Sequence, residues 1–441
     1  MKTRKWGKEK PKGGGVAIND NPPEASEPSP PLPASPPTDL ARERSSAFTG
    51  ISRSAVIIGF VSLLSDVSGE MIYPVLPIFI TEVLHAPATV VGLIEGISVG
   101  LSNVVSGFSG WFSDRIGRRK PIAFMGYALT AASRPVIAIA GVWPVVLGAR
   151  FAERFGKGIR NAPRDALLAE STADEHRGRA FGFERAMDSA GAVLGPLVAL
   201  ALVGWMGLAI RNVFLVSAIP ATLAALLILS VRERPGRVAG AKSMRLSLAG
   251  TTSDYRRLLL IIGIFGVGNS ANAFLILRAE QLGLSRGNTI LAYTLYNAVA
   301  SLVSIPAGVA SDRRGRRNLL IIGYLTYAAS YMGFAMADAA WLVWPLFIIY
   351  GLFPALTDGV AKALAVDTAG ATGRATAIGI YSAVTGLTQV LASYVGGLLW
   401  DKVDPRATFY FGAAMAVGAV LLLFALLPSQ SRTQKVHARA R

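Results

Sequence analysis

The sequence has 441 residues, of which 52% are hydrophobic and only 16% are charged, against roughly 25% charged in soluble domains, which excludes an ordinary soluble globular protein. Its 44 Lys and Arg residues outnumber 27 Asp and Glu residues and give a net charge of +17, so the chain either contacts nucleic acid or lies in a bilayer with its cations on one side. The absence of cysteine excludes disulfides and thiolate metal sites, and three histidines far apart in sequence lead us to expect no metal site.

The first 54 residues differ in composition from the rest of the chain. Residues 2–12 hold six Lys and Arg residues, and residues 22–37 hold eight prolines among Ser, Glu and Ala. Such a segment cannot bury enough apolar surface to offset its ordering entropy, so we expect a disordered tail without a signal peptide over residues 1–54. Its cations either contact anionic lipid headgroups or lie in solvent without a further role.

From residue 55 to residue 427 the chain is a series of apolar runs of about 20 residues, the length that crosses about 30 Å of hydrocarbon as a helix. Continuous runs such as residues 421–427 are not typical of barrel strands, which alternate. We therefore expect an all-α integral membrane protein with twelve transmembrane helices. The expected spans are residues 55–80, 88–112, 121–140, 143–162, 180–204, 210–231, 257–277, 289–311, 319–337, 340–361, 375–399 and 407–427.

The positive charge is distributed unevenly over the two sides of these spans. With the N-terminus in the cytoplasm, 35 of the Lys and Arg residues fall on the cytoplasmic side, including those at the cytoplasmic ends of spans; five fall on the opposite side and four deeper within spans. This asymmetry predicts that both termini are cytoplasmic, with the chain in the plasma (inner) membrane. It also leaves no need for a nucleic-acid partner.

An internal repeat divides the spans into two sets of six. Residues 110–120 read GWFSDRIGRRK and residues 308–318 read GVASDRRGRRN, an offset of 198 residues. The same offset relates Arg164 to Lys362. We expect two duplicated halves over residues 55–231 and 257–427, joined by a charged loop over 232–256 and followed by a basic tail over 428–441.

At these residues the chain resembles the major facilitator superfamily, whose signature G-x-x-x-D-R-x-G-R-R/K occurs twice. The matching positions are Gly110, Asp114, Arg115, Gly117, Arg118 and Arg119 in the first copy, and Asp312, Arg313 and Arg316 in the second. The resemblance implies two six-helix halves with a substrate site between them near the membrane midplane. It also implies that Asp114 caps and pairs at a cytoplasmic gate; a basic loop that only sets topology is the alternative.

A second pattern lies in the expected fifth span. Gly182, Gly191, Gly195 and Pro196 resemble the G-x8-G-x3-G-P-x2-G element of antiporters, including twelve-helix drug and tetracycline exporters, although the last position is Ala199. Glycines at this spacing line one helix face and allow a neighbouring helix to approach closely. The element favours antiport, and close helix packing alone remains the alternative.

Ionisable residues inside spans are costly and are candidates for function. The first half holds Asp66, Glu70, Glu95, Arg134, Arg150, Glu153, Arg154, Glu184, Arg185 and Asp188, whereas the second half holds only Asp358. We expect the first half to carry ion coupling and the second half to offer a more neutral surface to a substrate.

Asp66 and Glu70 are the strongest coupling candidates. They are four residues apart, so they share one helix face, and two close carboxylates in a low dielectric can bind and release a proton. Arg154 resembles the family's span-4 arginine, which is implicated in proton transfer, and Glu95 is a secondary carboxylate. The alternative is that Asp66 and Glu70 pair structurally with Arg134 or Arg154.

Two further sets of residues complete the predicted site. We expect Glu184 and Asp188 to pair with Arg160 or Arg164 as gate salt bridges. Polar and aromatic residues in the apolar spans suit a cavity for an amphipathic ligand, or else form interhelical hydrogen bonds. These residues are Tyr73, Asn269, Asn272, Tyr293, Tyr296, Asn297, Tyr381 and Gln389.

The sequence thus predicts a monomeric secondary transporter that exports a small organic compound in exchange for protons, with the lipid bilayer as its surroundings. The alternative is a proton symporter that imports an organic anion bound by Arg134, Arg150 or Arg154. We expect neither an enzyme nor a cofactor, because no nucleophile and base pair, metal motif or nucleotide fingerprint occurs. A sensor without transport would need a folded soluble domain, which neither the tail nor the central loop can form.

Overall fold

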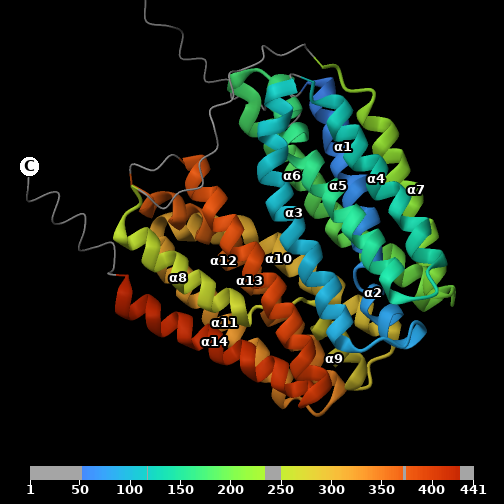
Figure 1. Cartoon of the computed structure of the whole chain (residues 1–441), viewed down its shortest axis with the longest axis vertical. Coiled ribbons are helices and arrows are strands. Elements are labelled where there is room, and N and C mark those ends of the chain that lie inside the picture. The colour runs from blue at the N-terminus through green and yellow to red at the C-terminus, as the bar shows by residue number, and fades with distance from the viewer. Residues whose placement is uncertain (1–51, 117, 234–249, 371–373, 428–441) are drawn as a thin grey trace, which may run out of the picture. The chain divides into compact units, whose positions relative to one another are not determined.

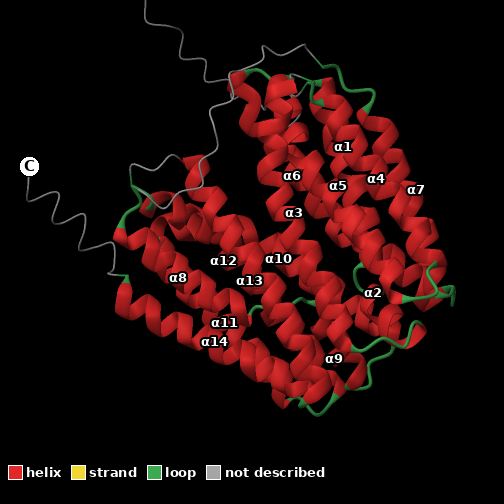
Figure 2. Cartoon of the chain, viewed as in Figure 1, coloured by secondary structure: helices red, strands yellow, loops and turns green. Residues whose placement is uncertain are grey.

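The structure, a computed structural model, describes residues 52–116, 118–233, 250–370 and 374–427; within these ranges the side chains of residues 107, 108, 110–116, 174, 374 and 375 are not described. The described residues form helices joined by short turns, and no strand occurs among them (Figure 2). The fold class predicted from the sequence is confirmed. Both expected tails, 1–54 and 428–441, and the central loop at 232–256 lie largely or wholly outside the described residues.

The helices of the two halves follow one another along the chain (Figure 1). The first half comprises α1 (Arg53–Ile72), α2 (Leu76–Ile78), η1 (Phe79–Val83), α3 (Ala88–Ile116), α4 (Lys120–Ile139), α5 (Trp143–Glu170), η2 (Asp174–His176), α6 (Arg177–Leu200), η3 (Ala201–Trp205) and α7 (Ile210–Ile228). The second half comprises α8 (Ser253–Gly268), α9 (Ala273–Gln281), α10 (Arg286–Arg314), α11 (Arg316–Met336), η4 (Ala340–Leu342), α12 (Val343–Thr368), α13 (Arg374–Lys402) and α14 (Pro405–Leu426).

Several helices begin at side chains that satisfy the free backbone amides of a first turn. Ser52, Thr252, Ser285 and Asp404 lie just before α1, α8, α10 and α14, and each accepts a hydrogen bond from a backbone N–H of its helix. The helix of the first expected span breaks near a proline. α1 ends at Ile72, before Pro74, because proline lacks the N–H that would continue the hydrogen bonds of the helix.

Eleven helical segments of the described chain are long and apolar enough to cross a membrane. The twelfth expected span, residues 143–162, corresponds to α5, which has 28 residues but a mean hydropathy too low for the same criterion. Its charged residues explain the difference, because several of them are buried against neighbouring helices rather than facing lipid. α5 also runs on to Glu170, past the expected end at residue 162.

Packing within one half repeats in the other. In the first half α1 packs against α6 and α7, α5 against α3 and α4, and α4 against α7. In the second half α8 packs against α13 and α14, α12 against α10 and α11, and α11 against α14. These are the same pairings in the same order, as expected for a duplicated fold. Between the halves, α3 packs along α13 and α6 along α10.

Candidate functional site

Among the described residues, two neighbouring cavities lie between the halves. The first has a volume of about 510 Å³ and lies among α3, α6, α8, α11, α12 and α13. The second has a volume of about 520 Å³ and lies among α6, α10, the first residue of α11 and α12. Arg185, Asp358 and Gly359 line both, so the two cavities adjoin. Together they offer a volume of the size that small-molecule sites occupy.

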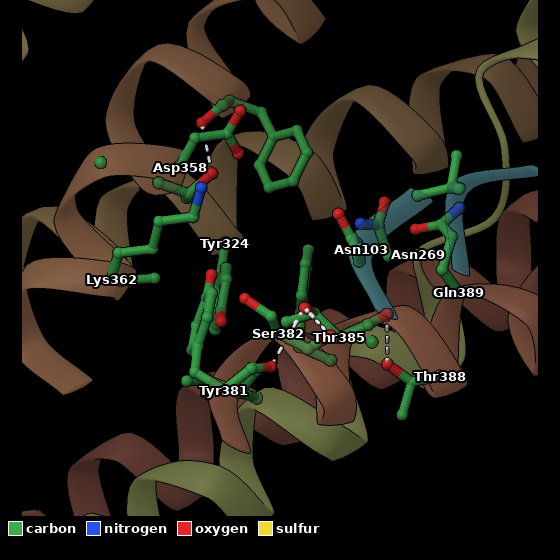
Figure 3. Close-up of a pocket in the computed structure, with 18 of the residues that line it drawn as sticks. Asn103, Asn269, Tyr324, Asp358, Lys362, Tyr381, Ser382, Thr385, Thr388 and Gln389 are labelled. Carbon is green, nitrogen blue, oxygen red and sulfur yellow. Dashed lines mark hydrogen bonds between the residues drawn. The ribbon is translucent and has the colours of Figure 1, made fainter. Parts of the chain in front are cut away.

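The first cavity combines polar groups with aromatic walls (Figure 3). Asn103, Asn269 and Gln389 gather at one end, and Asp358 and Lys362 lie at the other. Along one wall, Tyr324 stacks on Phe265 with 3.9 Å between ring centroids. Such a lining suits a ligand that has a flat apolar part and hydrogen-bonding groups.

The predicted cavity residues divide into two groups. Asn269, Tyr381 and Gln389 line the first cavity and Asn297 lines the second. Tyr73, Asn272 and Tyr296 line neither of these two cavities. Tyr73 stacks on Tyr293, while the Asn272 side chain donates to Tyr296 (3.1 Å) and accepts from the Tyr350 hydroxyl (2.7 Å). These three therefore make interhelical contacts.

The sequence interpretation missed most of the polar wall on α13. Tyr381, Ser382, Thr385, Thr388 and Gln389 all line the first cavity. Their spacing repeats at three and four residues, which places them on one face of a helix. This polar stripe in an apolar span is the signal that could have identified the wall. Asn103 offers no comparable pattern.

The two α1 carboxylates face different partners. Tyr293 of α10 donates a hydrogen bond of 2.9 Å to Glu70 Oε2, and Asn297 Nδ2 lies 3.5 Å from the same oxygen. Glu70 therefore contacts the second half. Asp66 instead has Oδ1 4.0 Å from Lys157 Nζ, within the first half. In the described part of the chain neither carboxylate is ion-paired with Arg134 or Arg154, the partners considered from the sequence.

A small cavity of about 20 Å³ adjoins both carboxylates, which is room for about one water molecule. Its lining comes from α1, α4 and α5, and comprises Ser65, Asp66, Gly69, Glu70, Thr130, Arg134, Glu153, Arg154, Lys157 and Arg160. Arg154 Nε is buried there without a hydrogen-bond partner in the structure. Asp66, Glu70 and Arg154, predicted as a coupling group, thus line a common cavity.

The glycine element of α6 packs against this face of α1. A Cβ atom on Gly191 would lie 2.8 Å from the Leu63 carbonyl oxygen, and one on Gly195 would lie 2.7 Å from the Val67 carbonyl oxygen. A Cβ atom on Gly182 would have no neighbouring atom within 4 Å. Gly191 and Gly195 therefore allow the close approach of α6 to α1, whereas Gly182 does not take part, and Pro196 is buried in α6 beside them.

Four charged residues form a network buried inside the first half. Arg150 contacts Glu95 at 2.6 Å and Glu153 at 2.7 Å, and Arg134 contacts Glu153 at 3.0 Å and donates to Ser68 at 3.1 Å. Both arginine side chains are 1% exposed. The network joins α1, α3, α4 and α5, and its two cations balance two anions. Glu95, Arg134 and Arg150 are thus held inside the half and do not line the two large cavities.

The predicted gate residues lie where α3 meets α4 and α10 meets α11, here called the basic end. Gly110 lies in α3, the side chains of Asp114 and Arg115 are not described, and Gly117 lies outside the described residues. Arg118 and Arg313 are exposed. Arg119 pairs with Glu170, and Arg316 pairs with Asp367 and lies 3.5 Å from Asp312.

Salt bridges of α6 also lie toward the basic end. Arg164 contacts Glu184 at 3.1 Å, one of the pairings considered from the sequence, whereas Asp188 lies 3.6 Å from Arg185. Among the described residues, each gate ion pair joins side chains of the same half. The second cavity extends to Asp312 and Arg316, so the space between the halves reaches the basic end.

The other end of the bundle, called here the opposite end, is closed by contacts between the halves. Glu82 of η1 pairs with Arg286 at the start of α10. Along α3, Cβ atoms on Gly92, Gly96 and Gly100 would each lie within about 3 Å of α13 atoms, so the two helices touch closely here.

The expected lack of charge in the second half needs correction. α9 continues to Gln281, past the expected end of the span at residue 277, so the helix also includes Arg278 and Glu280. Arg278 is 4% exposed, and it donates to the carbonyl oxygens of Phe334 and Ala337. The expected span ended too early because these charges interrupt the apolar run. The helix that forms this span therefore carries ionisable side chains that the sequence interpretation had placed outside it.

A family model and several known proteins match most of the chain. The family model described as Major Facilitator Superfamily matches residues 58–276 and 258–441. An uncharacterised MFS-type transporter of Methanocaldococcus jannaschii is 33% identical over 381 residues, covering 85% of this chain and 95% of the relative. A class C tetracycline resistance protein of Escherichia coli is 26% identical, covering 84% of this chain and 94% of the relative.

Solved structures share the fold at low sequence identity. The nucleoside transporter NupG has a TM-score of 0.70 at 14% identity, and the match covers 86% of this chain and 100% of that structure. A peptide transporter POT in complex with sulfate has a TM-score of 0.71 at 15% identity, and the match covers 86% of this chain and 95% of that structure.

Proposed function

The chain belongs to the major facilitator superfamily, and from that premise we propose that this multi-pass membrane transporter exports a small organic compound in exchange for protons. The two halves rock about the cavities between them and expose these cavities to one side at a time. Glu70 and Asp66 carry the proton, with Arg154 beside them. Tetracycline and multidrug resistance proteins among the relatives support export, and the glycine element of α6 supports exchange.

The observation that carries the proposal is the position of Glu70 between the halves. As a carboxylate it accepts from Tyr293, and Asn297 reaches the same oxygen, both from the second half. Hydrogen bonds to an ionised acceptor are roughly twice as strong as neutral ones. Protonation of Glu70 weakens this link between α1 and α10 and so favours separation of the halves at this level. Proton binding and conformational change are thereby coupled at one atom.

Asp66 provides the route by which the proton leaves Glu70. Both carboxylates line the water-sized cavity, so one water molecule can relay a proton between them. Lys157 offers Asp66 a positive charge at 4.0 Å, and the Arg154 guanidinium is a further positive charge at the small cavity that both carboxylates line. The close packing of α6 at Gly195 fixes the backbone of α1 beside Glu70.

The charge asymmetry of the sequence supports an orientation with the basic end and both termini in the cytoplasm of a cell with an inner (plasma) membrane. In that orientation the cavities open inward and the closed opposite end faces outward. The protein acts as a monomer, because the cavities lie within one chain. Binding of a cytoplasmic compound is then the first step of export.

Import of an organic anion is the competing function, and the structure offers it little support. Arg134 and Arg150, two of its three candidate anion sites, are ion-paired and 1% exposed. Because carboxylates already neutralise these buried arginines, a further anion would gain little electrostatic binding energy from them.

The direction of the proton gradient that drives accumulation tests the proposal. A compound that raises the melting temperature of the purified protein is selected from a panel of organic amines, acids and neutral aromatics, and its uptake into proteoliposomes is measured. Exchange predicts accumulation when the lumen is acidic, in vesicles of either protein orientation. Accumulation only when the outside is acidic would establish symport and overturn the proposal.

Weak bases collect passively in an acidic lumen, so two controls are needed. Protein-free vesicles measure the passive share. Vesicles that hold an Asp66→Asn, Glu70→Gln double variant contain a folded chain without its proton carriers, and their gradient-driven accumulation should match that of the protein-free vesicles.

A further inference from the structure

The start of α3 lacks a cap from its own half. Most of the backbone amides in a helix's first turn need acceptors from outside the helix. The residue before α3 is Pro87, whose side chain has no hydrogen-bond acceptor. The residue 198 positions later, at the repeat offset, is Ser285, and it caps α10 by accepting from the backbone N–H of Asn288. The two halves therefore differ at this position.

The missing cap comes from the other half. Asp401, near the end of α13, accepts hydrogen bonds from the backbone N–H of Ala88 at 3.0 Å and of Thr89 at 2.7 Å. The Thr89 hydroxyl donates to the same carboxylate at 2.5 Å. A carboxylate at a helix N-terminus also interacts favourably with the helix dipole. One side chain of the second half thus completes the first turn of a helix in the first half.

Opening of the opposite end would break this contact, because the contact joins the two halves there. α3 and α13 run antiparallel, since Gly92 approaches Ser393 whereas Gly100 approaches Gly386. Separation of the halves at the opposite end withdraws Asp401 from α3 and leaves the amides of Ala88 and Thr89 to water. The neighbouring Glu82 and Arg286 pair is exposed on both sides, and such pairs contribute little.

We propose that Asp401 is the positioning residue that holds the transporter in the state open at the basic end, by capping α3 across the two halves. The inference rests on the alternating-access part of the proposed function and is independent of substrate and coupling ion. Losing a helix cap to alanine costs a factor of about 2 to 30 in an equilibrium constant. Asp401→Ala therefore shifts the ratio of the two states by that factor toward opening at the opposite end.

Distances between spin labels on the full chain test this directly. The chain contains no cysteine, so spin labels attach only at the introduced pairs of cysteines. Met206 and Trp341 are 65% and 67% exposed at the opposite end, and Ser230 and Asn318 are exposed at the basic end. In Asp401→Ala the Met206 and Trp341 pair should gain a longer distance, while the Ser230 and Asn318 pair gains a shorter one. Thr89→Val, which removes one of three hydrogen bonds, should shift both in the same sense by less.

Asp404→Ala is the matched control. Asp404 lies three residues on and caps α14 by accepting from the backbone N–H of Arg406 at 2.7 Å, within its own half. Its loss removes a cap of the same kind without crossing the halves, so the distances should match those of the native chain. Distance distributions in Asp401→Ala identical to those in Asp404→Ala would overturn the proposal. If Glu70→Gln shifts the distances while Asp401→Ala does not, the proposed function stands and this inference alone fails.

Discussion

At the scale of single residues, the ionisable side chains in the membrane fall into two groups by their partners. Glu95, Arg134, Arg150 and Glu153 neutralise one another inside the first half. Glu70 instead reaches across to the second half. The sequence indicates that all of them are candidates, because charge in a span is rare. It does not separate the groups, because spacing along one helix says nothing of the side chains on the next.

Substitutions in the buried charge network should lower stability rather than change transport. Glu95→Gln removes a charge that Arg150 contacts at 2.6 Å, and breaking a buried pair costs about 3 kcal/mol or more. We expect a lower melting temperature in detergent and unchanged transport per folded molecule. The control is Asp254→Asn, whose pair with Arg257 is nearly half exposed on both sides and should contribute at most about 1 kcal/mol. A Glu95→Gln protein that melts normally but loses gradient-driven uptake would make Glu95 a proton carrier instead.

The polar wall of the first cavity should set affinity. Gln389→Leu leaves a ligand's hydrogen-bonding group unpaired in a site that excludes much of the water, and we expect about tenfold weaker binding. Titration of the compound selected by thermal shift measures this directly. Thr326→Val, on α11 and away from both cavities, is the control. Equal affinity in the native and Gln389→Leu proteins would remove Gln389 from the binding surface.

At the scale of helices, close approach between α1 and α6 positions the predicted coupling residues. The glycine spacing in the sequence predicted a tightly packed face, and Gly191 and Gly195 form it. The sequence did not reveal that α1 is the neighbour, or that Gly182 stands apart. Contacts between distant segments depend on the tertiary arrangement, which the spacing within one helix does not encode.

Two alanine substitutions in α6 separate the packing role from the motif itself. In Gly195→Ala the new Cβ would lie 2.7 Å from the Val67 carbonyl oxygen and 2.8 Å from Glu70 Cβ. Overpacking of this kind costs about 1–3 kcal/mol, and displacement of α1 should also reduce gradient-driven uptake at least several-fold. Gly182→Ala meets nothing within 4 Å and should leave both melting temperature and uptake unchanged. Equal behaviour of the two variants would show that the contact with α1 does not matter.

At the scale of the whole molecule, most of the fold followed from hydropathy and from the repeat. Both depend on properties that are local in sequence: the length of an apolar run and a motif that recurs after 198 residues. The exceptions are informative. By composition α5 is too polar for a span, and Arg278 interrupts the apolar run at the end of α9. In both segments the buried charges contact partners within the bundle. Burial with partners, which a hydropathy scale does not include, makes both segments compatible with a membrane.

The sequence alone did not show the cavities or which end of the transporter is open. Which end is open follows from contacts between residues hundreds of positions apart, such as Asp401 with Thr89. The repeat indicates that two halves meet but not how they are tilted. A single sequence also serves every state of the cycle, so no pattern in it can select the one observed.

The most direct test of the central claim compares two transport modes of Glu70→Gln in proteoliposomes. Exchange of labelled for unlabelled compound without a gradient needs binding and rocking but no net proton movement. Accumulation against a concentration gradient, driven by an acidic lumen, needs the proton as well. With Glu70 as the coupling residue, exchange should stay within about threefold of the native rate while accumulation falls at least tenfold, a loss of about 1.4 kcal/mol or more in coupling. Accumulation by Glu70→Gln equal to that of the native chain would contradict the account.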